Sequence, residues 1–475
     1  MGHHFNGAPF FNFLKMKRYY FSLLLFIFLF SSCANDSDSI YESLPILQER
    51  LLAGGETTVF LTSSNAFSTP AANLSGAKLD FHLDGDFQFE TVFVTAPSPV
   101  NSGVGPIFNN SSCIGCHPKD GRSAFPTNIN SLSGFFLRTS MPGVGNYNAP
   151  IPVPGFGGQI QNQAIFGFEP EAKFNVVYTP IVETLADGSQ VTLQKPTYSL
   201  IDTYIPFPAS ALLSSRLASP VFGLGLLEAI PEYYILNNED VNDADGDGIS
   251  GKANYVFDNV SGEVRLGRFG WKANTATIME QCAGAYVGDM GVTNPIFPFE
   301  TGYGQTNGDD GLNDDAEISL ALLDEITFYC QTLGVPAPRD LDDDSVLRGA
   351  ALFEQAQCAK CHIPKMISGS FSVAEVANQT FYPYSDMLLH DMGDGLADNR
   401  PDFLADGKEW RTKPLWGIGL TKVVNGHTDF LHDGRAKNIT EAILWHGGEA
   451  ENAKTIFKNL STSEREDLLK FINSL

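Results

Sequence analysis

Apolar residues follow a helical repeat in several segments of the chain. This spacing occurs in residues 214–230 (SSRLASPVFGLGLLEAI), 318–334 (ISLALLDEITFYCQTLG), 342–362 and 461–475. The segment from 342 begins with a run of aspartates suited to an N-cap, and the segment from 461 begins with the capping-box pattern Ser-x-x-Glu. These four segments predict amphipathic helices.

A different pattern, strict alternation of apolar and polar residues, covers residues 173–205 and is interrupted at Asp187-Gly188. Alternation on both sides of such a turn predicts a β-hairpin. A Gly/Pro-rich stretch precedes it from Met141. We therefore predict a mainly α fold with a β-rich insertion at about residues 141–235 in the N-terminal half.

The N-terminus carries a short apolar core between two basic residues and a cysteine. Apolar residues 19–30 are followed by Ser-Ser-Cys33. This order predicts a secretory signal peptide over residues 1–33, with Met16 as an alternative start. It resembles the bacterial lipoprotein kind, in which Cys33 becomes lipidated. A single membrane-anchoring helix is the alternative, but the apolar run is shorter than the roughly 20 residues of a span.

Composition and charge narrow the range of partners. Residues 34–57 read as a polar tether, and about 440 residues follow the signal, enough for two or three domains. Thirty basic and 55 acidic residues give a net charge of −25, which argues against nucleic acid, because a phosphate-binding face is basic. We expect an exported protein, lipid-anchored in the periplasm or at the outer membrane. Small electron-donor or acceptor proteins are the expected partners.

The sequence C-x-x-C-H occurs twice, at Cys113/Cys116/His117 and at Cys358/Cys361/His362. Two thiols followed directly by histidine are typical of covalent haem attachment, in which the histidine becomes the proximal iron ligand. Zinc is an alternative, but the motifs lie more than two hundred residues apart, far beyond the usual spacing of one zinc site. A redox dithiol needs no adjacent histidine. We predict two haem c groups.

The motifs divide the chain into two haem domains. An N-capped helix leads into the second motif and another helix ends the chain, which is typical of a cytochrome c domain at residues 341–475. Residues 58–340 form the predicted N-terminal haem domain, so the expected architecture is two cytochrome c-like domains. Two further cysteines, Cys282 and Cys330, either pair as a disulfide in an oxidising compartment or remain buried thiols.

Several segments together resemble one bacterial protein family. They are CIGCHPKDGR, DADGDGISGKANYV, GRFGWKA, PYSDMLLHDMGDGLAD, EWRTKPLWGIG and FLHDGRAKNITEAILWHGGEA. The chain resembles the dihaem oxidoreductases sometimes labelled thiol-oxidoreductase-like, which are related to the dihaem cytochrome c peroxidases. The resemblance implies two mainly helical haem domains that face each other, with a calcium ion between them in the peroxidases.

The sixth ligand decides whether an iron is closed or open to a small molecule. In the related peroxidases the C-terminal haem has a methionine ligand, and the matching segment here places His446 at that position. Met392 is the rival ligand, and a role for His446 as a helix cap or hydrogen-bonding group is a third alternative. The resemblance implies that His432 and Arg435 contact the haem propionates or support its ligands.

The first haem has no comparable candidate, because no histidine lies between His117 and His362. His82 lies upstream and is either a ligand that reaches back or a histidine of a solvent-facing loop. We expect an iron that is five-coordinate, water-bound or held by another group. Trp271, in GRFGWKA, is either a packing residue or an aromatic relay between the haems.

An acidic loop at residues 243–254 matches the first half of an EF-hand. Asp243, Asp245 and Asp247 alternate as calcium ligands do, but Asn254 stands where a bidentate glutamate is usual. The loop therefore predicts either a calcium site of another geometry or an acidic turn without metal.

Three functions fit these features. The first is a dihaem oxidoreductase with one electron-transfer haem and one reactive haem, peroxidase-like, for which a small-molecule oxidant is the expected substrate. The second is a pure electron-transfer cytochrome. The third is an iron- or haem-handling surface lipoprotein. The size of the chain favours the first, with the haem on His117 as the reactive one.

Overall fold

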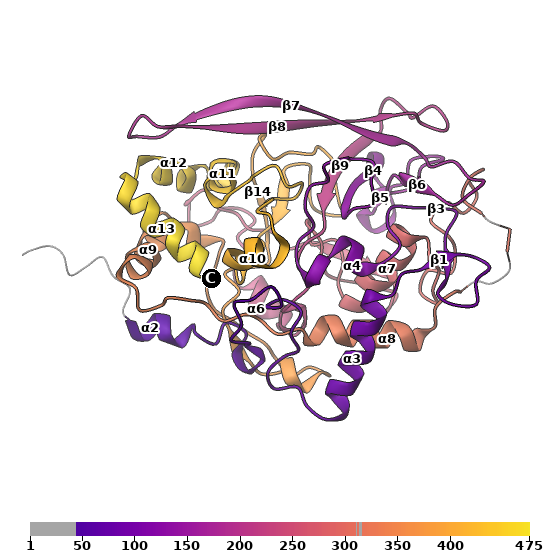
Figure 1. The fold of residues 1–475 in the computed structure, drawn as a ribbon. Coiled ribbons are helices and arrows are strands. Elements are labelled where there is room, and N and C mark those ends of the chain that lie inside the picture. The colour runs from indigo at the N-terminus through magenta and orange to yellow at the C-terminus, as the bar shows by residue number, and fades with distance from the viewer. Residues whose placement is uncertain (1–43, 310, 313–315) are drawn as a thin grey trace, which may run out of the picture. The chain divides into compact units, whose positions relative to one another are not determined.

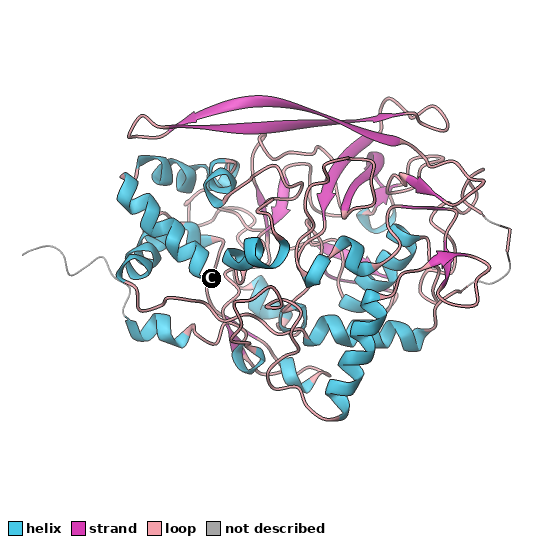
Figure 2. Cartoon of the chain, viewed as in Figure 1, coloured by secondary structure: helices cyan, strands magenta, loops and turns pink. Residues whose placement is uncertain are grey.

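The computed structural model describes residues 44–309, 311–312 and 316–475. Of these residues, 29% are helical and 20% are in β-structure, and the strands form seven small sheets. Loops connect the helices and strands (Figure 2). The predicted mainly α fold is therefore wrong. The physical reason is that many short extended segments pair with partners distant in sequence, which local apolar spacing does not reveal. The predicted domain boundaries remain predictions.

The helices are mostly short. They are α2 (Leu44–Glu49), α3 (Ala77–Glu90), α4 (Cys113–Cys116), α5 (Leu224–Glu228), α6 (Glu232–Leu236), α7 (Ile278–Met290), α8 (Leu320–Thr332), α9 (Asp344–Gln355), α10 (Thr421–Asn425), α11 (Ile439–Leu444), α12 (Glu451–Asn459) and α13 (Thr462–Ser474).

The strands pair mainly in twos, in the orders β1-β2, β3-β6, β7-β8, β10-β11, β12-β13 and β14-β15, with one three-stranded sheet, β5-β4-β9. Their bounds are β1 (Val94–Thr95), β2 (Ser102–Val104), β3 (Ile107–Phe108), β4 (Phe135–Val144), β5 (Pro150–Ile151), β6 (Gln163–Ala164), β7 (Lys173–Thr184), β8 (Gln190–Ile201), β9 (Leu212–Leu217), β10 (Tyr255–Asp258), β11 (Glu263–Leu266), β12 (Met366–Ile367), β13 (Thr380–Phe381), β14 (Leu389–Asp391) and β15 (Glu409–Arg411).

Three of the four predicted helices are present. Asp343 caps α9 through the backbone N–H groups of Ser345 and Val346, and Ser461 with Glu464 forms the capping box of α13. Helix α8 also lies where the apolar spacing predicts it. The prediction for residues 214–230 is partly wrong, because the segment begins in strand β9, which pairs antiparallel with β4, and only α5 is helical.

The predicted hairpin is present as β7 and β8, with Thr184 opposite Gln190 across the turn. It runs along one side of the described unit (Figure 1, top). Near its base, Phe174 packs in a cluster with Phe135 of β4. Near its tip, Leu185 and Leu193 pack in the cluster that contains α9 and α13. The hairpin therefore joins parts of the chain that lie far apart in sequence.

Two large apolar clusters hold the two predicted haem motifs. The first contains the facing side chains of α7 and α8 and of the segment around Phe222, and Cys113 packs against it. The second contains those of α9 and α13, and Cys358 packs against it. Helices α9 and α13 approach so closely that a Cβ at Gly349 would collide with the carbonyl of Asp467. Each C-x-x-C-H motif thus lies on its own rigid support.

The predicted signal peptide and the lipidation site Cys33 lie outside the described residues. Within the described residues, none of the helices combines the length and the apolar character that a membrane crossing requires.

Candidate haem sites

The first motif begins in α4, which Ser112 caps by accepting a hydrogen bond from the Gly115 N–H (3.2 Å). The His117 N–H donates to the Cys113 carbonyl (2.8 Å), so the short helix turn fixes the histidine directly after the two cysteines. His117 Nδ1 lies 2.7 Å from the Ser219 carbonyl. A carbonyl only accepts, so Nδ1 carries the proton and Nε2 keeps its lone pair for a metal.

The second motif repeats this arrangement. His362 N–H donates to the Cys358 carbonyl (2.9 Å), and His362 Nδ1 donates to the Tyr384 carbonyl (2.9 Å). Burial lowers the pKa of both His117 and His362 to about 4. Both imidazoles are therefore neutral at physiological pH, which is the form that binds iron.

His446 has the same chemistry as the two motif histidines. It directly follows Trp445, the C-cap residue of α11, and its Nδ1 donates to the Ala442 carbonyl (2.7 Å). Burial lowers its pKa. Its charge also contributes to the lowered pKa of His362, which shows that the two rings lie near each other.

One cavity brings His362 and His446 together. The two motif cysteines Cys358 and Cys361 line it, and so does Met392, the predicted rival ligand. Both candidates for the sixth ligand, His446 and Met392, therefore lie in the cavity. The Nδ1 of His446 is used in the bond to the Ala442 carbonyl, so Nε2 is the ring nitrogen available to a metal. Ser219, whose carbonyl accepts from His117, also lines the cavity, so the cavity extends to the support of the first motif.

Three cationic side chains line the same cavity: Arg411 is buried, and Arg122 and Lys413 are half-buried. Burial lowers the pKa of each arginine to about 10 and that of Lys413 well below its usual value. Among the described residues, the hydrogen bonds of these side chains go to backbone carbonyls and to the sulfur of Met387. Cations that are partly or fully removed from water without an ion-pair partner are costly, so the cavity suits a ligand that carries anionic groups.

A haem fits these walls, because it is a largely apolar ring system with two carboxylates. Trp271 stands between two of the cations, with the Arg122 guanidinium 5.5 Å and Lys413 Nζ 4.4 Å from its ring, and its indole N–H donates to the Leu217 carbonyl (2.9 Å). Trp271 thus forms part of the cavity wall as well as packing against its neighbours.

The structure places His432 in the cavity wall, stacked on Trp410 with ring centroids 3.9 Å apart. Burial lowers its pKa to about 3. Arg435 is absent from the described residues that line the cavity, and it pairs instead with Asp433 through Nη2 (2.9 Å). Among these predicted residues, His432 is therefore positioned to contact a cavity ligand, while Arg435 fixes the neighbouring Asp433.

Amides and carboxyl groups adjoin the first motif. The Gln159 amide donates to Asn109 Oδ1 (2.7 Å) and to Asp289 Oδ1 (2.8 Å). Asp289 is half-buried, and its carbonyl accepts from the N–H groups of Asn109 (2.8 Å) and Asn110 (3.0 Å), in the segment that leads into Cys113. A polar network therefore begins beside the first C-x-x-C-H motif.

The network continues to a buried glutamate. The Gln161 side chain donates to the Gly288 carbonyl (2.8 Å), which also accepts from Gln159, and the Gln161 N–H donates to Glu171 Oε2 (2.6 Å). Burial raises the pKa of Glu171 to about 8, although hydrogen bonds from Gln161 and Gln305 oppose the shift. Glu171 therefore holds its proton at neutral pH.

Comparison with known families agrees with the two motifs. A family model described as "Di-haem oxidoreductase, putative peroxidase" matches residues 49–475. The chain belongs to this family of di-haem oxidoreductases. No curated protein and no solved structure matches it.

The acidic loop of this di-haem oxidoreductase brings together Asp240, Asp243 and Asp245, with carboxylate oxygens within 4.8 Å of one another. The predicted third ligand, Asp247, instead forms an ion pair with Lys360, the residue before Cys361. A calcium site in this loop remains a prediction, with Asp240 brought close to the two predicted aspartates.

His82 of the oxidoreductase packs against Tyr329, with ring centroids 4.8 Å apart. It is buried in α3, and its Nδ1 is 2.7 Å from Thr332 Oγ1, so the interpretation as a solvent-facing loop histidine is wrong. Cys282 and Cys330 are unbonded and face each other, since Cys282 is the largest cause that raises the pKa of Cys330. Their predicted disulfide remains a prediction.

Sequence patterns did not single out the cavity cations or Glu171 of the oxidoreductase. Arg411 and Lys413 lie in one of the segments that resemble the family, but no local spacing marks them as facing a ligand. Arg122 ends the segment CIGCHPKDGR, which also resembles the family, and its position five residues after His117 was a further signal. Glu171 has no local signature, because only the fold shows that it is buried.

Proposed function

We propose that this di-haem oxidoreductase is an exported, lipid-anchored protein with two haem c groups, which reduces a small peroxide at the haem on His117. The arrangement that carries this proposal is the buried amide network that leads from the first motif to a protonated Glu171. Covalent attachment is supported by the two C-x-x-C-H motifs, whose histidines are half-buried, neutral and oriented through Nδ1. Iron held in this way would supply the redox chemistry.

His362 and His446 would hold the second haem from its two faces. Both present a free Nε2, and both lie in one cavity with the attachment cysteines. An iron held by two histidines is suited to electron transfer rather than to binding a small molecule. Arg122, Arg411 and Lys413 would pair with haem carboxylates, which would give these cations ion-pair partners inside the cavity.

The first site has different surroundings. Asn109, Gln159 and Gln161 offer amide groups, and Asp289 and Glu171 offer carboxyl groups. Reduction of a peroxide to water and an alcohol, or to two waters, consumes two electrons and two protons. Glu171 can release a proton near neutral pH and take one up again, and the amides can orient the peroxide oxygens by hydrogen bonds. An open iron position at this site would complete the arrangement.

Replacement of Glu171 by glutamine tests this function. The glutamine keeps the size of the side chain and an acceptor for the Gln161 N–H, but it has no proton to exchange. We expect peroxide turnover with a small-molecule electron donor to fall by about 10²–10⁴-fold, while carbon monoxide still binds one reduced haem. Unchanged turnover would refute the role of Glu171. Wild-type protein that binds no carbon monoxide and turns over no peroxide would favour a pure electron-transfer cytochrome.

The location and partners are part of the same proposal. The signal sequence ending at Cys33 supports export and lipidation, and a net charge of −25 supports a basic electron-transfer partner. Cys33→Ala should release the protein from the membrane fraction of expressing cells. If the variant remains membrane-bound, an uncleaved anchoring helix is the better explanation.

A further inference from the structure

We propose that the outer face of α3, defined by Asp80, Leu83, Asp84, Phe87 and Glu90, is the docking surface for a small basic redox protein that exchanges electrons with the haem on His117. This inference rests on the proposed function, because it requires a haem at the first motif. It adds the place at which the basic partner docks and the haem with which it exchanges electrons.

Helix α3 presents apolar side chains on two opposite faces. His82, Gly85 and Phe89 are buried against the rest of the protein, while Leu83 is 49% and Phe87 is 68% exposed. Leu83 and Phe87 are four residues apart and therefore lie one turn apart on the same outer face. A surface helix usually has one apolar face, so large apolar side chains on its solvent side indicate an interaction surface.

Carboxylates surround this apolar pair. Asp80, Asp84 and Glu90 are exposed along the helix, and Asp86 is half-buried. The one basic residue of α3, Lys78, is occupied by an ion pair with Glu375 (2.8 Å). An apolar centre with an acidic rim fits a partner that has an exposed apolar edge and a ring of lysines, the complementary pattern.

The inner face of the same helix touches the support of the first haem. The Phe89 ring centroid is 6.1 Å from that of His117 and 5.2 Å from that of Tyr329, and the His82 ring is 4.8 Å from Tyr329. Helix α3 crosses α8 so closely that a Cβ at Gly85 would collide with the Glu325 carbonyl. One helix thickness of packed aromatic groups therefore separates the docking surface from the proximal histidine, which is a short route for an electron.

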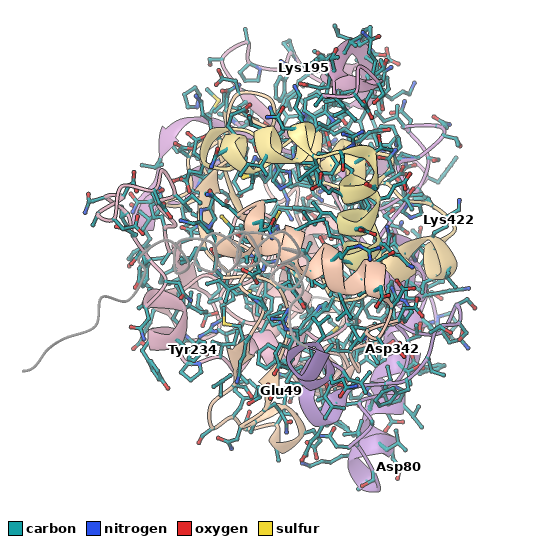
Figure 3. All side chains as sticks on the ribbon, turned by 90° about the vertical axis from the view of Figure 1, so that its left-hand side faces the viewer. Glu49, Asp80, Lys195, Tyr234, Asp342 and Lys422 are labelled. Atoms are coloured by element: carbon teal, nitrogen blue, oxygen red, sulfur yellow. The ribbon has the colours of Figure 1, made fainter. Side chains whose placement is uncertain are left out.

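The position of α3 leaves this face accessible within the described unit. In Figure 1 the helix lies beside α8 at the side opposite the β7–β8 hairpin. Figure 3 shows the same separation, with Asp80 at the foot of the view and Lys195 of the hairpin at the top. A partner bound to α3 would therefore not contact the hairpin.

Two substitutions and two matched controls test the surface. Phe87→Ser removes the apolar centre and Asp84→Lys reverses one rim charge. Tyr233→Ser changes an aromatic side chain that is 65% exposed on α6, and Asp342→Lys reverses an exposed charge that lies away from α3. The probe is reduced basic mitochondrial cytochrome c, and the measurements are its Kd at low salt and the rate at which it reduces the holoprotein.

We expect Phe87→Ser and Asp84→Lys each to weaken binding about fivefold or more and to slow electron transfer from the probe, whereas the controls stay within about twofold. Reduction by dithionite and peroxide turnover with a small-molecule donor should not change in any of the four variants. Equal weakening by Asp342→Lys would overturn the proposal, because it would show a general effect of net charge.

Other occupants of the surface give different results. A wild-type dimer that Phe87→Ser converts to a monomer, without effect on the probe, would show that a second copy of the chain covers α3. Chemical reduction that fails in wild type would contradict the proposed function itself. If wild type does not bind the probe but is still reduced by dithionite, the docking surface is contradicted and the proposed function is not.

Discussion

Lys360, which lies between the two cysteines of the second motif, forms an ion pair with Asp247 of the acidic loop. Lys360 Nζ thus links the haem attachment segment to a loop more than one hundred residues earlier. The pair is partly exposed, with 40% of the Lys360 side chain accessible. Pairs of this kind contribute little to stability, so its main effect is to hold the loop against the motif.

Calcium should bind beside this ion pair. Asp240, Asp243 and Asp245 are close enough to share one ion, and their mutual repulsion would then be relieved. We expect added Ca²⁺ to raise the melting temperature of wild type and to have no effect on Asp243→Asn/Asp245→Asn. Asp309→Asn, outside the loop, is the control. A calcium response that the double variant keeps would place the ion elsewhere.

Covalent attachment should give two haem c groups per chain. Cys358→Ala/Cys361→Ala removes both thiols of the second site and leaves the first site intact, because the motifs pack against separate apolar clusters. Pyridine haemochrome analysis should give about one haem c for this variant and about two for wild type. Zinc in the metal analysis, or one haem in wild type, would contradict the prediction.

Removal of His446 should open the second iron. His446→Ala deletes the imidazole whose Nδ1 is held by Ala442, and we expect a low-spin signal to become high-spin. Carbon monoxide should then bind both reduced haems, where wild type binds it at one. Met392→Leu is the matched control, since Met392 lines the same cavity. If Met392→Leu opens the iron and His446→Ala does not, methionine is the ligand.

Glu171 also predicts a dependence of stability on pH. Its pKa is about 8 in the folded protein, so the folded state holds a proton that the unfolded chain releases near the ordinary value of 4.5. The free energy of unfolding contributed by this group therefore falls as pH rises from about 4.5 to about 8. Relative to wild type, Glu171→Gln should gain stability between pH 5 and pH 8, by on the order of a few kcal/mol. Denaturant unfolding at the two pH values measures the difference, and a constant difference would contradict the buried, protonated glutamate.

The close contact between α9 and α13 predicts that one added methyl group at Gly349 lowers the stability of the protein. Gly349→Ala forces a Cβ against the Asp467 carbonyl, which cannot move without shifting α13. We expect a loss of about 1–3 kcal/mol in the free energy of unfolding. Gly284→Ala in α7 is the control, because its Cβ would meet only Phe297 at 3.9 Å, and it should stabilise the helix by about 0.5–1 kcal/mol.

The features that could be predicted from sequence are those encoded locally. Each of these features depends on a few neighbouring residues. They are the two C-x-x-C-H turns, the helix caps at Asp343 and Ser461, and the hairpin turn at Asp187-Gly188. Strand β9 was missed because its pairing with β4 is a tertiary contact that overrides local spacing. The cavity cations could not be predicted for the same reason, because they come together only through tertiary contacts. Arg122 and Arg411 lie almost three hundred residues apart in the sequence and line one cavity only in the folded chain.

The hairpin formed by β7 and β8 also constrains the order in which the molecule can be completed. Glu183 near its tip pairs with Lys458 (2.6 Å), and the Ala186 N–H donates to the Lys458 carbonyl (3.0 Å), 275 and 272 positions later in the chain. Because synthesis runs from the N-terminus to the C-terminus, the tip has no partner until the last helices emerge. A nascent chain that stops before α12 therefore carries a two-stranded ribbon whose tip lacks its contacts with Lys458 and with the last helices, and such a ribbon is exposed to proteases and to aggregation.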